Sequence, residues 1–339
     1  MSITNVIYKS DLFSRVTEVS INGKRLITPT YFPAVSSYGI KYQFDALVRL
    51  LITYSYPRLL ISAYDFHLLD NKSEKLAREI GEYSKKGCVV FLDSGIYESF
   101  WKADDKWSYD LYRNSISQVN FDFYSSFDVL PYAEDLGLKF SRDTLENILA
   151  SRKLSDKLGF VPILHGRSPD ELVSLVTMLM KEHPHLCDFI AIPERDCGDD
   201  VVAKAKTIVK IRKLLDKDDH GRILHILGCG NPISLILFSY CGADMFDSLD
   251  WIKYVIDQNR LIVRDSSHLE LTNCECAICS GIKRNYIEKV LLHNLLFYQN
   301  YMLQIQLLIR RDEISEFLTR RIGQDIVKKI RRFGLKFET

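Results

Sequence analysis

The chain has 339 residues, of which 47% are hydrophobic, and its 45 basic and 44 acidic side chains give a formal net charge of +1. This is an ordinary globular composition with enough apolar residues for a large core. The balanced charge gives no overall signal for nucleic acid, and no apolar run reaches the roughly 18 residues that a membrane span needs. The amino terminus also lacks the features of a signal peptide, so we expect a cytoplasmic protein without membrane contact.

Eight short apolar segments, most of them followed by a helical pattern, recur along the chain. A strand followed by a helix is the repeating unit of a parallel barrel, so the pattern predicts an α/β fold, a (β/α)8 TIM barrel. A turn at Asn22-Gly23 predicts a hairpin within residues 1–24 that covers the bottom of this barrel. The expected strands are 26–35, 58–62, 89–92, 121–127, 160–164, 187–192, 223–227 and 243–247.

Polar residues follow five of these expected strands: Asp93, Asp128, His165, Glu194 and Asp247. In a parallel barrel the carboxyl ends of the strands build the active site, so these side chains are expected to meet on one face. A single aspartate at such a junction can equally be a helix N-cap. Five polar side chains at the same end favour a functional site.

The segment from Asp93 to Tyr97 suits a flat ligand. It brings a carboxylate, a glycine that permits close backbone approach and an aromatic ring within five residues. The stretch after it is rich in aromatic residues, namely Trp101, Trp107, Tyr109 and Tyr112. Two interpretations stay open for this stretch: a helix that packs its rings on the barrel, or a lid or stacking surface for nucleic-acid bases.

Three cysteines are clustered near the carboxyl end, Cys274, Cys276 and Cys279, and His293 follows on a long helical pattern. Three thiolates and one imidazole are the ligand set of a structural zinc site, in which no position is left for a catalytic water. The alternative is a set of unrelated thiols in a reducing cytoplasm.

This cluster also divides the chain. We expect a catalytic barrel domain over residues 1–258, which includes the N-terminal hairpin. Residues 259–339 are expected to form a zinc-binding subdomain with C-terminal helices. Within it, 261–263 and 269–271 are expected to form a β-ribbon just before the cysteines.

The motifs, taken in order, resemble those of the tRNA-guanine transglycosylases and their relatives that act on 7-deazaguanine bases. Asp93-Ser94-Gly95-Ile96-Tyr97 is similar to the family's DSGGYQ motif, and Asp244-Met245-Phe246-Asp247-Ser248 matches its D-x-FD motif. The other resemblances are Thr28 to Val35 with TPxFxPV, Ser62 to Leu68 with NTYHL, Phe127-Asp128 with the base-recognising aspartate motif, His165-Gly166 with a QG motif, Leu227 to Pro232 with MGVGxP, and the Cys and His set with the zinc ligands.

The resemblance implies a mechanism. Asp247 would be the nucleophile that attacks the sugar C1′ and expels guanine, and Asp93 would be the general acid/base that handles the proton of the departing and arriving base. A covalent enzyme–nucleic acid intermediate and net retention of configuration follow from this double displacement. The base would be bound by Tyr97, Asp128, His165, Glu194, Gly228 and Gly230, with His165 in a position where the family usually has glutamine.

Departures from the family pattern shape the expected substrate. The GGLAVGE stretch is replaced by Ala191 to Arg195, with a proline that removes a backbone donor, and the PTRxGR segment after the nucleophile is replaced by Leu249 to Ile252. The chain also ends before the C-terminal RNA-binding domains of the archaeal tRNA enzymes. These losses look most like the DNA-guanine transglycosylases of 7-deazaguanine DNA-modification systems.

The expected reaction is therefore exchange of guanine in DNA for a 7-deazaguanine base such as 7-cyano-7-deazaguanine. Alternatives are a compact tRNA-guanine transglycosylase and a non-catalytic partner subunit of such an enzyme; retention of both Asp93 and Asp247 argues against the subunit. The resemblance also implies structural Zn²⁺, a homodimer and a partner ATPase that opens DNA.

Overall fold

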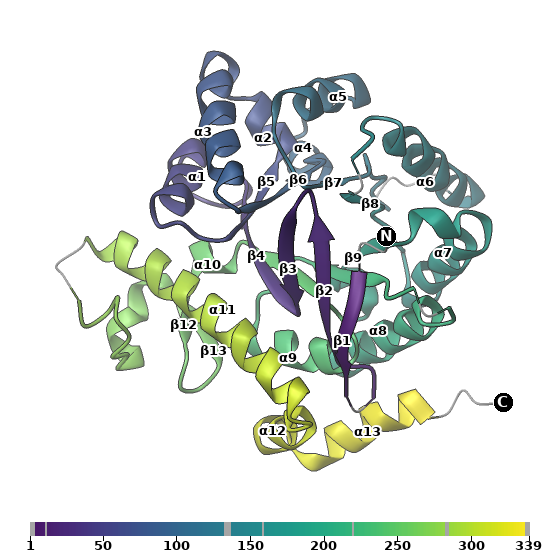
Figure 1. The fold of residues 1–339 in the computed structure, drawn as a ribbon, viewed down its shortest axis with the longest axis vertical. Coiled ribbons are helices and arrows are strands. Elements are labelled where there is room, and N and C mark those ends of the chain that lie inside the picture. The colour runs from purple at the N-terminus through teal and green to yellow at the C-terminus, as the bar shows by residue number, and fades with distance from the viewer. Residues whose placement is uncertain are drawn as a thin grey trace.

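Eight parallel strands form one sheet that curls into a barrel, with helices around its outside (Figure 1). The structure is a computed structural model that describes residues 4–10, 12–131, 137–157, 159–218, 220–281 and 285–335. Around the barrel the strand order is β8-β7-β6-β5-β4-β11-β10-β9, and each neighbouring pair in this order is parallel. The strands are β4 (Thr30–Val35), β5 (Arg58–Ser62), β6 (Val89–Asp93), β7 (Phe123–Ser125), β8 (Gly159–Val161), β9 (Phe189–Pro193), β10 (Ile223–Leu227) and β11 (Met245–Ser248).

The barrel closes between its first and last strands in this order. Ile163, just beyond β8, forms a parallel bridge with Ala191 of β9. The Leu164 amide donates to the Ala191 carbonyl at 3.0 Å, and the Ala191 amide donates to the Pro162 carbonyl at 2.9 Å. The predicted TIM barrel is therefore confirmed.

Helices cover the outer surface of the barrel and extend beyond it. The α-helices are α1 (Phe44–Thr53), α2 (Ala63–His67), α3 (Ser73–Lys85), α4 (Ile96–Trp101), α5 (Tyr109–Gln118), α6 (Gly137–Arg152), α7 (Pro169–Glu182), α8 (Val201–Leu215), α9 (Pro232–Tyr240), α10 (Asp250–Lys253), α11 (Tyr286–Arg310), α12 (Ile314–Ile322) and α13 (Gln324–Leu335). Four 3₁₀ helices are described as well, Asp70–Lys72, Pro184–Leu186, Glu194–Cys197 and Ser266–Thr272. Within the described residues, no helix is both long and apolar enough to cross a membrane.

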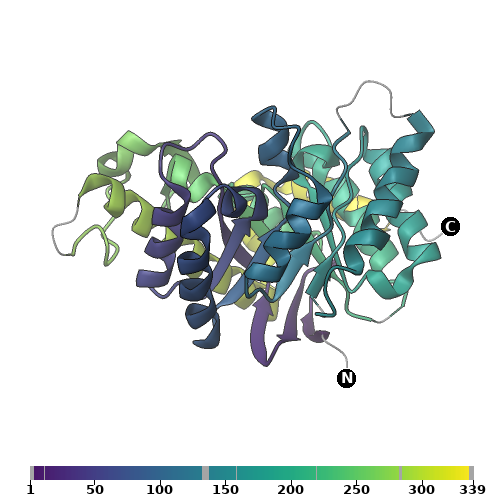
Figure 2. The same ribbon diagram turned by 90° about the horizontal axis from the view of Figure 1, so that it is seen from above.

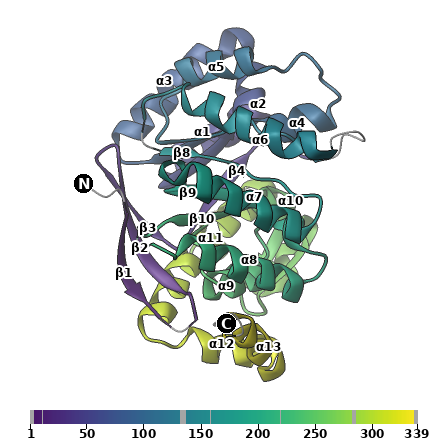
Figure 3. The ribbon, with the colours of Figure 1, turned by 90° about the vertical axis from the view of Figure 1, so that its right-hand side faces the viewer.

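The N-terminal segment is a three-stranded antiparallel sheet of β1 (Thr4–Lys9), β2 (Arg15–Ile21) and β3 (Lys24–Thr28). The two-residue turn between β2 and β3 has positive φ angles at both Asn22 (49°) and Gly23 (76°), as a type I′ turn requires. The sheet lies at the lower side of the molecule in Figure 2 and at the left edge in Figure 3. Its apolar residues Val19, Ile21 and Leu26 pack with the side chains that fill the barrel interior, as the predicted plug requires.

One expected strand is divided, because residues 26–35 form two strands instead of one. Five of the other expected strands are observed with ends shifted by one to three residues. Pro29 separates β3 from β4, and a proline has no amide hydrogen to donate to a strand ladder. Pro33 is tolerated inside β4 because it is the last residue paired with β11, and pairing with β5 begins only at Ala34.

The predicted β-ribbon also differs from the observed one. It forms between β12 (Tyr254–Asp257) and β13 (Ile262–Asp265), whereas 269–271 lie in a 3₁₀ helix. Val255 and Ile256 are buried, β-branched residues that favour a strand. The Asp265 side chain accepts a hydrogen bond from the Ser267 amide at 2.9 Å and so turns the chain into the 3₁₀ helix.

The aromatic stretch after β6 divides into two parts. Trp107 and Tyr112 are buried in the core, so the packing interpretation holds for them. Trp101 lies at the end of α4 with 52% of its surface exposed. Of Trp101, Trp107 and Tyr112, only Trp101 is accessible to a ligand.

Candidate active site and metal centre

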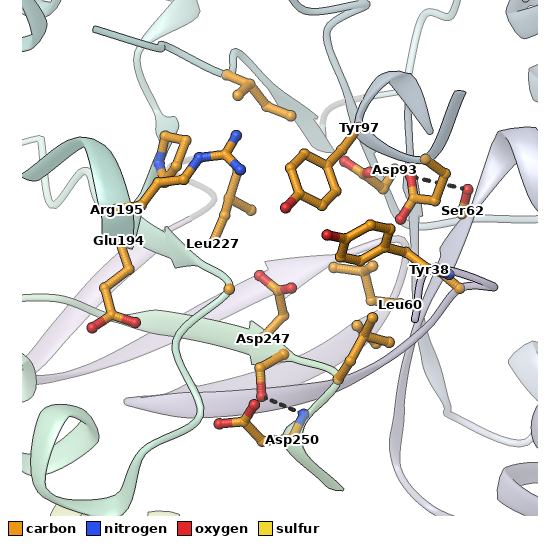
Figure 4. A pocket seen from close by; sticks show the side chains of 18 of the residues that line it. Tyr38, Leu60, Ser62, Asp93, Tyr97, Glu194, Arg195, Leu227, Asp247 and Asp250 are labelled. Carbon is orange, nitrogen blue, oxygen red and sulfur yellow. Dashed lines mark hydrogen bonds between the residues drawn. The ribbon is translucent and has the colours of Figure 1, made fainter. Parts of the chain in front are cut away.

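A cavity of about 350 Å³ lies at the carboxyl ends of the barrel strands (Figure 4). Seven of the eight residues that the sequence predicts for catalysis and base binding line it: Asp93, Tyr97, Asp128, His165, Glu194, Gly228 and Asp247. They come from six successive strand ends, which is why positions far apart in the sequence meet here.

Gly230, the eighth predicted residue, is not in the cavity lining. A Cβ atom added to it would lie 2.0 Å from Ser248 Oγ and 2.5 Å from Asp250 Oδ2. This glycine therefore lets the loop after β10 pack against the loop after β11. Gly228, by contrast, lines the cavity and has a positive φ of 72°.

His165 lies between two buried carboxylates. Its Nε2 atom is 2.9 Å from Asp128 Oδ2, and its Nδ1 atom is 3.0 Å from Asp196 Oδ2. Burial lowers the pKa of the imidazole, but the hydrogen bonds and charges of Asp128 and Asp196 outweigh burial and raise this pKa to about 9. At neutral pH the ring is an imidazolium that donates to both carboxylates, so it holds Asp128 in place.

Asp128 keeps capacity for a ligand despite these contacts. Ser94 Oγ donates to its Oδ1 atom at 2.5 Å, and His165 donates to Oδ2. A carboxylate offers about four lone-pair sites, so two remain for other donors.

Asp93 is the last residue of β6 and is partly buried. It accepts hydrogen bonds from Ser125 Oγ at 3.2 Å and from the Gly95 amide at 3.4 Å. Burial raises the pKa of Asp93, the nearby charges of Asp128 and Asp247 raise it further, and the result is about 7. A carboxyl group with a pKa near neutrality is suited to both accepting and donating a proton.

The turn after Asp93 depends on Gly95. Its φ angle is 75°, and an added Cβ atom would lie 2.4 Å from Tyr64 Cβ and 2.6 Å from the Tyr64 amide nitrogen. Only a residue without a side chain fits this left-handed position beside the backbone. The turn starts α4 at once, which places Tyr97 in the cavity wall two residues later.

Asp247 lies across the cavity from Asp93 and near His225 of β10 (Figure 4 shows the two aspartates). His225 Nε2 is 2.9 Å from Asp247 Oδ1, yet neither atom has a hydrogen bond of acceptable geometry to any described residue. A buried carboxylate oxygen without a hydrogen-bond donor is poorly stabilised. Such an oxygen is suited to attack an electrophilic carbon.

Tyr97, Arg195 and Glu194 form another part of the wall. The Arg195 guanidinium carbon lies 4.5 Å from the centre of the Tyr97 ring, and the two side chains face each other in Figure 4. Glu194 accepts a hydrogen bond from Lys204 Nζ at 3.0 Å, so its charge is already compensated within the protein.

Helix α11 holds the loops that carry the site from outside the barrel. Tyr298 donates to the Gly230 carbonyl at 2.9 Å, and its ring stacks on Tyr31 of β4 with 3.9 Å between ring centres. Asn294 donates from Nδ2 to the Trp251 carbonyl at 3.0 Å. These contacts fix the backbone on both sides of Asp247.

Sequence reasoning missed Glu98, Asp196 and His225. Glu98 is one residue beyond the Tyr97 motif, lines the cavity and accepts a hydrogen bond from Ser62 at 3.5 Å. Burial, with the charges of Asp93 and Asp65, raises the pKa of Glu98 to about 8. The signal available for Glu98 and Asp196 was an acidic residue within a few positions of a predicted site residue. His225 stands inside an apolar strand, where sequence alone gives no such signal.

The predicted metal ligands come together beside α11. One ligand atom from each of Cys274, Cys276, Cys279 and His293 lies within 4.8 Å of all the others. Nδ1 of His293 is 3.5 Å from Sγ of both Cys276 and Cys279. A tetrahedral ion with Zn–S of about 2.3 Å and Zn–N of about 2.0 Å separates sulfur from nitrogen by about 3.5 Å. The donor set therefore fits a metal ion such as zinc.

The orientation of His293 also suits a ligand. Its Nε2 atom lies 2.7 Å from the Ile256 carbonyl, to which it donates a hydrogen, so the lone pair of Nδ1 faces the sulfur atoms. Gln258 Nε2 donates to Cys274 Sγ at 3.0 Å, a contact that stabilises a thiolate. The metal site therefore joins the start of α11 to the ribbon of β12 and β13.

Comparison with known proteins places the chain in a family. A family model described as queuine tRNA-ribosyltransferase matches residues 141–325, which is more than half of the chain. The chain belongs to the queuine tRNA-ribosyltransferase family. The matched part includes His165, Glu194, Asp247 and the four metal-ligand candidates.

Similar curated members of this family come from archaea and bacteria. A tRNA-guanine(15) transglycosylase of Methanocaldococcus jannaschii is 24% identical over 80% of this chain and 43% of its own length. One from Nanoarchaeum equitans is 22% identical over 94% of this chain and 77% of its own length. A queuine tRNA-ribosyltransferase of Francisella tularensis is 25% identical over 45% of this chain and 50% of its own length. The chain thus spans about two fifths of the length of the first of these relatives.

The raised pKa values predict how stability changes with pH. Asp93 and Glu98, with pKa values of about 7 and about 8, hold protons in the folded chain that the unfolded chain releases from about pH 4 upward. The free energy of unfolding therefore falls as pH rises through this range. Asp93→Asn removes the part of this decrease that comes from Asp93, because asparagine does not titrate. Chemical denaturation should show the stability of Asp93→Asn relative to wild type rising by more than about 1 kcal/mol between pH 5 and pH 8.

Asp105→Asn is the control for this measurement, because Asp105 is an exposed aspartate on the same connecting segment. Its stability relative to wild type should be the same at both pH values. If Asp93→Asn behaves in the same way, the pKa of Asp93 is not raised.

The metal centre predicts the zinc content of the protein. Purified protein should contain about one zinc ion per chain, and Cys276→Ser should lower both the zinc content and the melting temperature, since structural zinc contributes to folding. Glu275→Gln is the control, since this exposed residue lies between two of the ligands and is not one of them. Metal analysis that finds no zinc in well-folded wild-type protein would contradict the four-ligand site.

Proposed function

We propose that this chain is a guanine transglycosylase, which exchanges a guanine base in nucleic acid for another base through a covalent intermediate on Asp247. The observation that carries the proposal is the placement of Asp93 and Asp247 in one buried cavity at the strand ends, with different environments. Asp93 has a pKa of about 7, and Asp247 has an oxygen without a hydrogen-bond donor. Two carboxyl groups that differ in this way are suited to a double displacement at a sugar carbon.

In the first step a carboxylate oxygen of Asp247 attacks C1′ of the target nucleotide. The bond between C1′ and the guanine nitrogen breaks, the base leaves with the bonding electrons, and Asp93 donates a proton to it. An ester now joins Asp247 to the sugar. This attack inverts the configuration at C1′. The attack of the incoming base in the second step inverts it again, so the overall reaction retains the configuration.

In the second step the incoming base occupies the place of guanine. Asp93, now ionised, takes the proton from the nitrogen of the incoming base, that nitrogen attacks C1′, and the ester bond to Asp247 breaks. Both aspartates return to their starting states. The same carboxyl group serves as acid and as base, which a pKa of about 7 supports.

The base would be held by the wall of the cavity. Tyr97 would stack on its plane, and the free lone pairs of Asp128 would accept hydrogen bonds from N1 and the exocyclic amine of the base. His165 would hold Asp128 in the correct orientation. Glu98, with a pKa of about 8, is protonated at neutral pH and can donate a hydrogen bond into the cavity. The incoming base in this proposal is a 7-deazaguanine such as 7-cyano-7-deazaguanine.

Transfer RNA is the nucleic acid that the comparisons favour. The curated relatives from Methanocaldococcus jannaschii and Nanoarchaeum equitans are named for guanine 15 of tRNA, and the Francisella tularensis relative is named for tRNA as well. We therefore place tRNA first, ahead of the DNA substrate that the sequence motifs suggested.

DNA stays the second candidate because of one local departure. Leu249 to Ile252 replaces the segment that follows the nucleophile in bacterial tRNA enzymes, and in this structure it forms the N-cap and most of the short helix α10. A non-catalytic partner subunit is the third candidate. A zinc ion in the Cys and His cluster, a partner ATPase and a homodimer remain predictions from the resemblance.

Exchange of radiolabelled guanine tests the proposal. Wild-type protein is incubated with labelled guanine and either bulk tRNA or double-stranded DNA, and label incorporated into the polymer is measured. Asp247→Ala should lower incorporation by about 10³-fold or more because the nucleophile is lost, and Asp93→Asn should lower it by about 10²- to 10⁴-fold because the proton transfer is lost.

Asp105→Ala is the matched control, since it removes an exposed carboxylate outside the cavity and should keep wild-type exchange. Incorporation into tRNA supports the first candidate substrate, and incorporation into DNA alone supports the second. Exchange into neither polymer by folded, zinc-loaded protein, or full activity of Asp247→Ala, would overturn the proposed catalytic function.

A further inference from the structure

An aromatic cluster leads from the cavity to the protein surface. Tyr38 and Tyr97 line the cavity, and their ring centres are 5.0 Å apart. The Trp101 ring lies 6.1 Å from the Tyr97 ring and 6.1 Å from the Tyr38 ring, and Phe100 lies 5.4 Å from Trp101. We call these four residues the aromatic platform. Its inner rings belong to the cavity wall and its outer rings to the surface of α4.

The outer part of the platform is unusually exposed for large apolar side chains. Trp101 has 52% and Phe100 45% of its surface accessible, whereas Tyr64 and Trp107 are buried. Exposed aromatic rings next to a buried cavity mark a surface that a partner covers. A nucleobase is a partner with a flat face that stacks on such rings, whatever its sequence.

Positive side chains accompany the platform. Lys253 Nζ lies 4.9 Å from the centre of the Tyr38 ring, and the Arg195 guanidinium lies 4.5 Å from the Tyr97 ring. Lys102, next to Trp101, is held by hydrogen bonds to Ser37 and Asp65. Cations beside aromatic rings are the arrangement that binds single-stranded nucleic acid, in which bases stack and phosphates are neutralised.

The cavity itself carries side chains of both charges. Six carboxyl groups line it, at Asp93, Glu98, Asp128, Glu194, Asp247 and Asp250, and so do four basic side chains, at His165, Arg195, Lys204 and Lys253. His165 is paired with Asp128 and Lys204 with Glu194, and Lys253 and Arg195 lie against the rings of Tyr38 and Tyr97. The backbone of a bound strand is therefore expected to lie beside Lys253 and Arg195 while the target base enters the cavity.

From these observations we propose that the aromatic platform stacks a nucleotide next to the extruded guanine, so that α4 and the loop of Tyr38 form part of the nucleic-acid interface. The partner is an unpaired stretch of nucleic acid, either a loop or an opened duplex. This inference rests on the proposed function, because it assumes that the cavity receives a base that is still attached to its strand.

Tryptophan fluorescence gives a direct test, because the chain has three tryptophans and only Trp101 is exposed. Trp107 is 7% exposed and Trp251 is fully buried. A base that stacks on an indole quenches its fluorescence. The probes are two labelled stem-loops of the same sequence, one of RNA and one of DNA, each with a guanine in the loop. Binding is followed by fluorescence anisotropy and by tryptophan emission in the absence of free base.

The expected result has three parts. Wild-type fluorescence is quenched on binding. Trp101→Ala weakens the Kd for the stem-loop by about tenfold, a loss in the range of one base–aromatic stack, and raises the KM for nucleic acid without changing the KM for free guanine. Trp101→Phe keeps a stacking ring, so its Kd stays within about twofold of wild type while the quenching is lost.

Leu303→Ala is the matched control, because Leu303 is also 52% exposed but lies on α11, outside the cavity lining. It should bind like wild type. Unquenched wild-type fluorescence on binding, a Trp101→Ala variant that binds within twofold of wild type, or a wild type that binds neither stem-loop would overturn the platform. The two proposals can fail separately. Quenched binding without any base exchange supports the platform and refutes the transglycosylase. Base exchange without quenching refutes only the platform.

Discussion

The site depends on the burial of several carboxyl groups in one small cavity. Six of them line a space of about 350 Å³, where ionised carboxylates repel one another and lose contact with water. The protein resolves this by placing the imidazolium of His165 between Asp128 and Asp196 and by letting the pKa values of Asp93 and Glu98 rise to about 7 and about 8. Protonated and ionised carboxyl groups therefore coexist in the cavity.

This division of states is what the proposed chemistry needs. A protonated carboxyl group can give a proton to a leaving base, and an ionised one can attack a sugar carbon. The proposed roles of Asp93 and Asp247 rest on their surroundings, since Asp93 is partly buried near other negative charges and an oxygen of Asp247 has no hydrogen bond of acceptable geometry. Base recognition by Asp128 rests in the same way on the charge of His165.

The framework outside the barrel serves this cavity. Helix α11 contacts the loops after β10 and β11 through Tyr298 and Asn294, and its first turns carry His293, which the cysteine cluster faces. A metal ion in that cluster would fix the start of α11 against the ribbon of β12 and β13. The metal candidate is therefore joined through one helix to the backbone beside Asp247.

Sequence alone was sufficient for the barrel and for seven residues of the cavity lining. Short apolar runs that end in a polar residue located the strand ends, and the barrel geometry then brings Asp93, Asp128 and Asp247 together. The break at Pro29 and the role of Gly230 were not predictable in this way, because they depend on pairing and packing with residues far along the chain. His225 was missed because a histidine within an apolar strand is usually a core residue, and only the pairing of β10 with β11 shows that it lies beside Asp247.

The exposed end of the aromatic stretch shows a related limit. Trp101 and Trp107 have the same residue type and lie six positions apart, yet one faces solvent and the other the core. Their difference arises from the end of α4 at Trp101 and the loop that follows it, which no periodicity in the sequence reveals. The packing interpretation therefore holds for Trp107, and the stacking interpretation stays a prediction for Trp101.

The most direct test of the account is to trap the covalent intermediate. A labelled guanine-containing stem-loop is incubated with wild-type protein and with Asp247→Asn in the absence of an incoming base, and the products are separated under denaturing conditions. The account predicts a labelled protein–nucleic acid adduct with the wild type, its release when free guanine is added before denaturation, and no adduct with Asp247→Asn. An adduct of equal yield with Asp247→Asn would contradict the assignment of Asp247 as the nucleophile.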